Sequence, residues 1–292
     1  MQLTEFQEKM LPLLEKHLKA YLVNFAENKT LTKAMAYSLE AGGKRIRPLL
    51  IMLICESLGK KIDDDILSVA GSLEFLHTYS LIHDDLPEMD NDDLRRGKPT
   101  NHKIFGQDIA VLAGDALLTE AFGWLAQTKL SPQIKVDLVA KLANAAGANG
   151  MVAGQVEDIL GEKTNYTLAE LMQVHKNKTG QLLEYACYAG ATLANATKEQ
   201  RVTFCEFGRN FGLAFQIYDD ILDVTATTEQ LGKTAKKDLA ENKNTYPSLL
   251  GLAGAKDALA DTLEKTKKQL ADLQASGVET ALLVQLLDYF KI

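Results

Sequence analysis

The chain has 292 residues, a length that one hydrophobic core can still support, so we expect a single domain over residues 1–292. Its 32 Lys and Arg against 39 Asp and Glu give a net charge of −7, which excludes a generally basic surface for nucleic acid. With 46% hydrophobic and 24% charged residues, the composition is that of a globular protein and excludes wholesale disorder or a fibrous repeat.

Apolar residues recur at three- and four-residue steps along most of the chain, which is the pattern of helices. No βαβ pattern and no Gly-x-Gly-x-x-Gly motif is present. The predicted helical stretches, in chain order, are 6–22, 33–41, 47–58, 64–86, 108–128, 132–149, 168–194, 198–224, 246–251 and 254–291. We therefore predict an all-α fold, a single-domain antiparallel bundle of about ten or more helices.

The sequence carries little that points to a membrane or to export. The apolar run Pro48–Cys55 is far shorter than the roughly 20 residues that span a bilayer. Acidic residues near Met1 stand where a signal peptide has basic ones. Three scattered cysteines in apolar surroundings indicate reduced core residues rather than a zinc site. We expect a cytoplasmic protein with no membrane and no nucleic acid among its partners.

The first of two acidic clusters places six acids within residues 84–93, directly after the apolar pair Leu81 and Ile82. Carboxylates at the C-terminal end of a helix are unfavourable unless a cation compensates them. On a straight helix Asp84 and Asp90 would lie about 9 Å apart along the axis and point in different directions. Pro87 is expected to bend or end the helix, which could bring these two side chains back together.

The second acidic cluster, Asp219, Asp220 and Asp223, follows the apolar stretch 211–217. Asp219 and Asp223 are four residues apart and share one helical face, where like charges repel. Oxygen ligands of this kind suit Mg²⁺, which keeps several waters and takes further ligands from substrate phosphates. Either cluster alone would be an ordinary solvated helix end; the two together predict metal sites.

Cations gather beside these acids. Gly42 and Gly43 precede Lys44, Arg45 and Arg47, which offers a flexible backbone and donors that fit phosphate oxygens. Further cations lie after the first cluster and at later breaks: Arg95, Arg96, Lys98, Lys176, Lys178, Lys233, Lys236, Lys237 and Lys243. A negatively charged chain arranged in this way is suited to hold a polyanion through both metal ions and direct donors.

Two histidines lie on the stretch that leads into the first cluster. His77 and His83 are six residues apart, do not share a helical face and are poor candidates for a paired metal site. His77 remains a candidate to donate a hydrogen bond to a diphosphate.

Seven motifs occur together in a characteristic order: Gly-Gly-Lys-Arg-Ile-Arg-Pro at 42–48, His-Thr-Tyr-Ser-Leu-Ile-His-Asp-Asp-Leu-Pro-Glu-Met-Asp at 77–90, Leu-Arg-Arg-Gly-Lys-Pro-Thr at 94–100, Gly-Gln-Val-Glu-Asp at 154–158, Lys-Thr-Gly at 178–180, Phe-Gln-Ile-Tyr-Asp-Asp-Ile-Leu-Asp at 215–223 and Leu-Gly-Lys at 231–233. By these motifs the chain resembles the trans-isoprenyl diphosphate synthases, and within them the bacterial farnesyl diphosphate synthases, over nearly its whole length. The resemblance implies a helical bundle around a deep central cavity, with the Asp-rich motifs facing each other at its mouth, and a homodimer.

The resemblance also implies a role for each matching residue. Magnesium, three ions when substrate is bound and replaceable by Mn²⁺, would be held by Asp84, Asp85, Asp90, Asp219, Asp220 and Asp223. The allylic diphosphate would be contacted by Arg95, Lys178 and Lys233, which with Asp84, Asp85, Asp90 and Asp219 form the catalytic set. The diphosphate of isopentenyl diphosphate would be bound by Lys44, Arg47, His77 and Arg96. Thr179 and Gln216 would line the reacting end of the allylic chain, and Lys243 ranks below Lys233 as a phosphate contact.

The implied reaction is magnesium-dependent ionisation of the allylic carbon–oxygen bond, attack by the double bond of isopentenyl diphosphate, and loss of a proton to the released diphosphate. Tyr79 lies five residues before Asp84, about 7.5 Å deeper along the helix, so its ring can form the floor of the cavity. We therefore expect a fifteen-carbon product, made from dimethylallyl diphosphate through geranyl diphosphate. A twenty-carbon (geranylgeranyl diphosphate) synthase, a terpene cyclase and a non-catalytic partner subunit remain as alternatives.

Overall fold

The computed structural model describes residues 1–25, 27–226 and 243–291. Helices account for nearly all of the regular structure in these residues, and the predicted all-α fold is confirmed. The chain divides into two compact units. We call residues 4–49 and 63–139 the N-terminal unit, and residues 1–3, 50–62 and 140–292 the C-terminal unit. That all of them form one domain stays a prediction.

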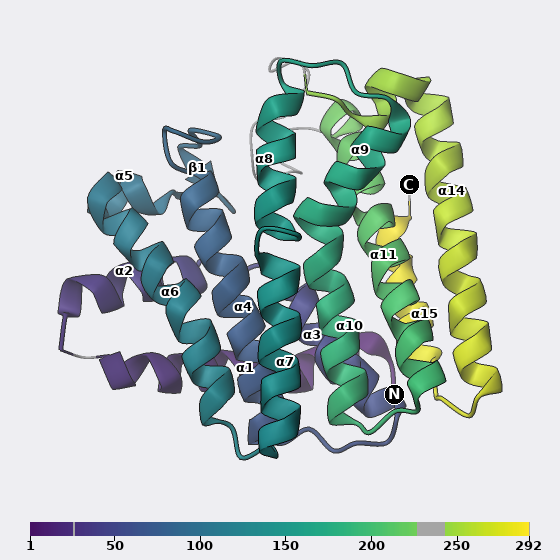
Figure 1. Ribbon diagram of the computed structural model, residues 1–292, viewed down its shortest axis with the longest axis horizontal. Coiled ribbons are helices and arrows are strands. Elements are labelled where there is room, and N and C mark those ends of the chain that lie inside the picture. The colour runs from purple at the N-terminus through teal and green to yellow at the C-terminus, as the bar shows by residue number, and fades with distance from the viewer. Residues whose placement is uncertain (26, 227–242, 292) are drawn as a thin grey trace. The chain divides into compact units, whose positions relative to one another are not determined.

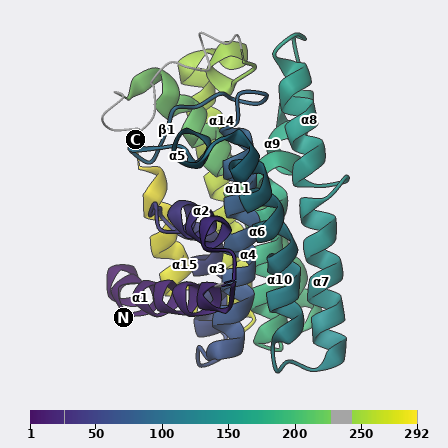
Figure 2. The same ribbon diagram turned by 90° about the vertical axis from the view of Figure 1, so that its left-hand side faces the viewer.

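The N-terminal unit is built around two long helices that pack side by side, α4 (Asp64–Asp84) and α6 (Gln107–Gln127). Gly71 of α4 allows this close approach, because a side chain there would collide with the Trp124 ring of α6. The Tyr21 ring stacks on the same indole with 4.0 Å between centroids. Helices α1 (Leu3–Leu22) and α2 (Lys29–Leu39) run across the direction of α4 and α6 (Figures 1 and 2). Smaller elements complete the unit: η1 (Val23–Phe25), the start of α3 (Ile46–Ser57), α5 (Asn101–Phe105) and the start of α7 (Pro132–Ala146).

A small hairpin, β1 (Leu94–Arg95) and β2 (Lys98–Pro99), follows the first acidic cluster. The residues that connect its strands, Arg96 and Gly97, have φ values of 56° and 74°. Two positive φ values in a two-residue loop are the signature of a type I′ turn, which matches the twist of paired strands. The sequence predicts only a polar break here, so the hairpin is a feature that the structure adds.

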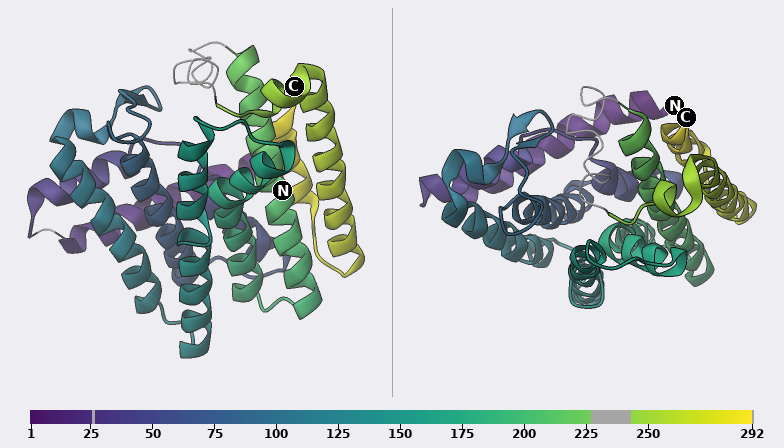
Figure 3. Two further views of the ribbon diagram at one scale, coloured as in Figure 1. Left: turned by 45° about the horizontal axis from the view of Figure 1, so that its top comes forward. Right: turned by 90° about the horizontal axis from the view of Figure 1, so that it is seen from above.

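The C-terminal unit is centred on α11 (Lys198–Thr225), which lies between α10 (Gln181–Leu193) and α14 (Tyr246–Ala275) (Figures 1 and 3). Three phenylalanines of α11 are fully buried in its core, namely Phe204, Phe207 and Phe211. The remaining elements are the second part of α3, the end of α7, α8 (Met151–Gly161), α9 (Leu168–His175), the π-helical turn η2 (Lys176–Gly180), α15 (Ala281–Leu286) and η3 (Leu287–Phe290).

Several predicted boundaries are wrong for identifiable reasons. Two helices were not predicted: α8, most of whose apolar residues are exposed and whose pattern is interrupted by Gly154 and acids, and the short α5. The predicted helix 254–291 ends at Ala275, because Gly277 adopts a φ of 91° and reverses the chain. The break expected between 251 and 254 is present as a kink, with Gly251 at φ 71°.

Among the described helices, α6 alone is long and apolar enough to cross a membrane by length and composition. Its apolar length is not apparent from the sequence, because Asp115 and Glu120 interrupt the apolar run. In the structure one face of α6 is buried in the unit through Ala113, Leu117 and Ala121. This is how the core helix of a globular protein is placed.

Candidate active site

The first acidic cluster lies on a tight turn at the end of α4. The helix ends at Asp84, and the backbone N–H of Asp90 donates to the carbonyl of Asp84 at 2.8 Å. Within the turn, Leu86 accepts from the N–H groups of Met89 and Asn91. The prediction that the helix bends or ends near Pro87 is confirmed, and the turn brings the backbone of Asp90 back to that of Asp84. Asp84 and Asp90, both half-buried, therefore stand at the beginning and the end of one compact turn.

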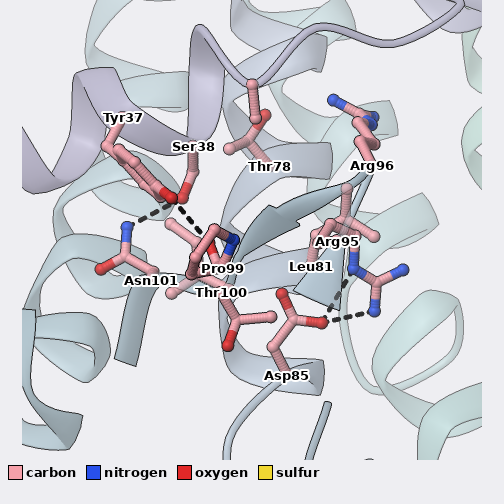
Figure 4. Close-up of a pocket in the computed structure, with 12 residues that line it drawn as sticks. Tyr37, Ser38, Thr78, Leu81, Asp85, Arg95, Arg96, Pro99, Thr100 and Asn101 are labelled. Atoms are coloured by element: carbon pink, nitrogen blue, oxygen red, sulfur yellow. Dashed lines mark hydrogen bonds and ion pairs between the residues drawn. The ribbon is translucent and has the colours of Figure 1, made fainter. Parts of the chain in front are cut away.

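The buried member of this cluster, Asp85, is held by Arg95 of the hairpin (Figure 4). Arg95 donates from Nε, at 2.8 Å, and from Nη2 to Asp85 Oδ1, and Nη2 also lies 3.4 Å from Asp92. Asp85 is only 4% exposed, and burial raises the pKa of its carboxyl although the Arg95 guanidinium opposes this. The structure therefore brings Arg95 together with the acidic cluster through its Nε and Nη2 edge, and its contact with a diphosphate stays a prediction.

The next hairpin residue, Arg96, points the other way, toward the glycine pair. Its Nη1 donates to the carbonyl of Gly42. A Cβ atom at Gly43 would lie 2.7 Å from both Arg96 Nη atoms, so the missing side chain is what makes room for the guanidinium. Burial lowers the pKa of Arg96, with attraction to Glu74 opposing and repulsion by Arg45 adding to the shift. Binding of an anionic ligand would stabilise the charged form of Arg96 against this burial and repulsion.

Arg47 and His77, both predicted to bind isopentenyl diphosphate, meet in the structure. Arg47 Nη1 lies 3.2 Å from His77 Nε2. Burial and then the charge of Arg47 lower the pKa of His77 well below its usual range, so the imidazole is neutral and Nε2 accepts. His77 thus orients Arg47, while Lys44 is exposed on the same loop.

Arg45, which the sequence grouped with the phosphate donors, faces the interior instead. It is 4% exposed, and its guanidinium forms ion pairs with Glu74 at 2.5 Å and Glu15 at 2.8 Å. It also donates to the carbonyl of Leu39. Arg45 is therefore not available as a phosphate donor like Lys44 and Arg47, because its own donors are used by acceptors inside the unit.

Tyr79 is buried on α4 below the acidic turn. Its ring packs edge-on against His83 with 5.6 Å between centroids. Burial, with the nearby charge of Asp84, raises the pKa of Tyr79 to about 12, so the phenol stays protonated. A Cβ at Gly114 of α6 would lie 3.0 Å from His83 Cε1, so this glycine gives the imidazole its space. That Tyr79 limits product length stays a prediction.

The second acidic cluster lies in the last turns of α11, with Asp219 half-buried and Asp220 and Asp223 buried. Asp220 Oδ2 accepts the N–H of Tyr246, the first residue of α14, at 2.9 Å. Asp220, Asp223 and Lys243 line one pocket of the C-terminal unit. The backbone of α14 thus holds one carboxylate of this cluster, Asp220, in place.

Lys178 and Thr179 belong to the π-helical turn η2, a kind of turn often found at functional sites. Lys178 Nζ lies 2.6 Å from Asp158 Oδ2. The Thr179 side chain is buried, and Gln216 is half-buried on α11, which passes close to η2 where Gly212 meets Gly180. The structure therefore brings Lys178, Thr179 and Gln216 onto neighbouring elements.

One face of α8 supports this turn, and sequence reasoning quoted its motif without giving it a role. Gly154 lies against the backbone of Lys178, Glu157 accepts from Asn177 Nδ2 at 3.1 Å, and Asp158 binds Lys178. The signal was available, because positions i, i+3 and i+4 share one helical face. Asn244 was also missed: its side chain bonds the backbone of Gly161, Thr164 and Tyr166 and so fixes the start of α14 beside Lys243.

The donor set fits magnesium by its chemistry. Both clusters offer mainly carboxylate oxygens, the hard ligands that Mg²⁺ prefers. One histidine stands beside each: His83 precedes Asp84 in the sequence, and His175 Nε2 lies 4.0 Å from Asp220 Oδ2. Within residues 1–25, 27–226 and 243–291, no three acidic, histidine or cysteine side chains are already gathered around a point. Mg²⁺ takes few protein ligands and completes its shell with water and phosphate oxygens, so such a gathering is not required. The predicted phosphate contact Lys233 lies outside the described residues.

Comparison with known proteins agrees with these features. A sequence model of the polyprenyl synthetase family matches residues 28–279, so the chain belongs to the polyprenyl synthetase family. It is 48% identical over 286 residues to a farnesyl diphosphate synthase of Geobacillus stearothermophilus, covering 97% of this chain and 96% of that protein. It is also 48% identical over 260 residues to a chloroplastic geranylgeranyl pyrophosphate synthase of Capsicum annuum, covering 88% of this chain and 70% of that protein.

Among solved structures, a geranyltransferase of Helicobacter pylori in complex with magnesium and isoprenyl diphosphate superimposes with a TM-score of 0.85 at 33% identity. The match covers 98% of this chain and 95% of that one.

Proposed function

We propose that the protein is a farnesyl diphosphate synthase, a prenyltransferase that condenses isopentenyl diphosphate with dimethylallyl diphosphate and then with geranyl diphosphate. The observation that carries the proposal is the turn at the end of α4, which returns Asp90 to Asp84 and anchors Arg95 on Asp85. Carboxylates on one compact turn, with a guanidinium from the hairpin bound to it, suit a diphosphate that arrives with its metal ions. The relative from G. stearothermophilus supports this product.

Magnesium, held by Asp84, Asp85, Asp90, Asp219, Asp220 and Asp223, would neutralise the charge that develops on the departing diphosphate. We propose three ions per site, replaceable by Mn²⁺, and the magnesium in the Helicobacter pylori structure supports the metal. The protein residues add fixed positive charge. Because Asp85 uses the Nε and Nη2 edge of Arg95, the diphosphate would reach this residue at Nη1. Lys178 would contact the diphosphate while Asp158 holds its ammonium group in position, and Lys233 would add a third cation.

Isopentenyl diphosphate would bind to the cations of the N-terminal unit. Arg96 and Arg47 carry donors held by Gly42 and His77, and Lys44 adds an exposed ammonium from the same loop. These groups orient the diphosphate so that the double bond can attack the allylic carbon after the carbon–oxygen bond ionises. The proton then leaves to the released diphosphate, which is the strongest base that the reaction itself supplies. Thr179 and Gln216 would lie beside the reacting carbons.

A second product is worth testing, because the geranylgeranyl pyrophosphate synthase of Capsicum annuum is as similar in identity as the farnesyl diphosphate synthase. Both reactions use the same acids and cations and differ in how far the chain can extend. The buried ring of Tyr79 favours the shorter, fifteen-carbon product. A non-catalytic partner subunit is disfavoured by the complete set of acids in both clusters.

We also propose a cytoplasmic homodimer. Exposed apolar side chains lie along α8, at Val152, Val156, Ile159 and Leu160, and on α6, at Val111 and Leu112. Apolar side chains grouped on a helix surface are typical of a protein–protein interface. A measured mass of one chain in solution, by sedimentation at micromolar concentration, would exclude the dimer.

The metal assignment is tested by Asp84→Asn and Asp219→Asn, assayed with magnesium and both substrates. Each should lower kcat by about two orders of magnitude or more, because a ligand to the metal on the leaving group is lost. Asp93→Asn is the matched control, since Asp93 is exposed and pairs with Lys103 at 2.7 Å. Full turnover in both site variants would exclude these carboxylates as metal ligands.

A further inference from the structure

The glycine-rich segment 42–47, a loop that runs into the start of α3, is fastened to the N-terminal unit by one buried cation, Arg45. Its guanidinium joins three helices, through Glu15 on α1, the carbonyl of Leu39 on α2 and Glu74 on α4. Glu74 is itself only 2% exposed. The backbone of Arg45 has a φ of 48°, in the left-handed region that non-glycine residues rarely adopt. The residue is therefore held against a conformational preference.

Stability alone does not account for this arrangement. A buried ion pair must repay the desolvation of both charges, and well-packed apolar residues often serve stability as well or better. The left-handed backbone of Arg45 adds a further conformational cost. What the ion pair does supply is geometry, since a planar guanidinium with three fixed acceptors sets the position and direction of the chain that carries it.

The chain that it carries bears the groups proposed to bind isopentenyl diphosphate. Three residues before Arg45, the carbonyl of Gly42 accepts from Arg96, and Gly43 leaves the space in which that guanidinium lies. Two residues after Arg45, Arg47 meets His77. Lys44 is the immediate neighbour. Any shift of Arg45 would therefore move both the donors on the loop and the acceptor that holds Arg96.

We propose that Arg45, with Glu74 and Glu15, is the positioning group of the isopentenyl diphosphate site, which it shapes without touching the substrate. The inference rests on the proposed function, because it takes Lys44, Arg47 and Arg96 as the diphosphate donors. It assigns a separate role to the middle cation of the Lys-Arg-Ile-Arg motif at 44–47. Removal of the guanidinium fork should weaken binding of isopentenyl diphosphate while leaving the allylic substrate almost unaffected.

The test uses the full chain with two variants that separate position from stability. Arg45→Lys keeps the positive charge but loses the planar set of guanidinium donors. The double variant Arg45→Met with Glu74→Leu removes both buried charges together. We expect each to raise the KM for isopentenyl diphosphate about tenfold or more, since misplacement by about 1 Å can cost that much. The KM for geranyl diphosphate should stay within about twofold, and the double variant should unfold near the wild-type temperature.

Calorimetric titration with isopentenyl diphosphate gives the same comparison without turnover. A folded double variant that binds this substrate as tightly as the wild type would overturn the inference. If the double variant does not fold, Glu15→Gln decides, because Glu15 is about a third exposed and its loss leaves the buried Arg45 still paired with Glu74. Arg209→Met, at a partly exposed ion pair with Glu184, is the control and should change neither KM. Normal binding with no turnover in the wild type would instead refute the proposed function.

Discussion

Gly154 is the position where a single methyl group should do the most damage to the site on the C-terminal unit. Its Cα faces the backbone of η2, and an added Cβ would lie 2.6 Å from Lys178 Cα and 2.8 Å from the carbonyl carbon of Asn177. Ordinary contact begins at 3.4 Å, so the shortfall from Lys178 Cα is about 0.8 Å. Backbone atoms cannot rotate away, so α8 or η2 must move.

Two effects oppose each other in Gly154→Ala. Alanine favours the helix by about 1 kcal/mol over glycine, while overpacking a buried contact costs about 1–3 kcal/mol and more where backbone must shift. We expect the cost to win and the free energy of unfolding, from urea titration, to fall by about 1–2 kcal/mol. Because η2 carries Lys178 and Thr179, kcat/KM for the allylic substrate should fall at least about tenfold.

The matched control is Gly123→Ala, on α6. There an added Cβ would meet only the flexible carboxylate of Glu120, at 3.3 Å. The same substitution should therefore stabilise the protein by up to about 1 kcal/mol, through helix propensity alone. A Gly154→Ala protein as stable and as active as the wild type would refute the close approach of α8 to η2.

Three further predictions concern buried groups near the proposed site. Burial lowers the pKa of His175 to about 4 from 6.5, so between these pH values the unfolded chain binds a proton that the folded chain does not. The free energy of unfolding should therefore fall by about 3 kcal/mol as the pH drops from 6.5 to 4. A His175→Gln variant should lose this part of the pH dependence. Tyr79→Ala should shift the product toward twenty carbons in a chromatographic assay, and an unchanged product would exclude Tyr79 as the floor. Asp158→Asn should change stability by less than about 1 kcal/mol, since its ion pair with Lys178 is partly exposed, yet raise the KM for the allylic substrate; an unchanged KM would mean that Asp158 does not position Lys178.

The acidic turn shows what local sequence could predict. Carboxylates at a helix end beside a proline are enough to expect a bend that returns Asp90 to Asp84, because the forces involved act within ten residues. The kink at Gly251 was likewise predictable from a break in the apolar pattern. The all-α class followed from periodicity along the whole chain.

The placement of the cations was not predictable in the same way. Arg45 and Arg47 are two residues apart in one motif, yet one is buried between Glu15 and Glu74 and the other meets His77. The difference depends on carboxylates that are 30 and 29 residues away from Arg45 in the sequence. Composition marks a cation-rich loop, but only tertiary packing decides which cation is satisfied internally.

The hairpin gives a second example. Arg95 and Arg96 are adjacent, and the type I′ turn sends one to Asp85 and the other to Gly42. That α8 was not predicted from the sequence has a similar cause. Exposed apolar residues on this helix hide, in the sequence pattern, the face that packs on η2. Both elements carry or support the proposed site residues, so the gaps in the prediction fell where function depends on contacts between distant segments.

Product identification tests the central claim most directly. The purified protein would be incubated with magnesium, dimethylallyl diphosphate and labelled isopentenyl diphosphate, and the dephosphorylated products separated by chain length, with a chelator-treated sample in parallel. A metal-dependent product that is mainly farnesol is the predicted result. Geranylgeraniol as the main product would contradict the fifteen-carbon assignment, and no metal-dependent product at all would contradict the proposed prenyltransferase activity itself.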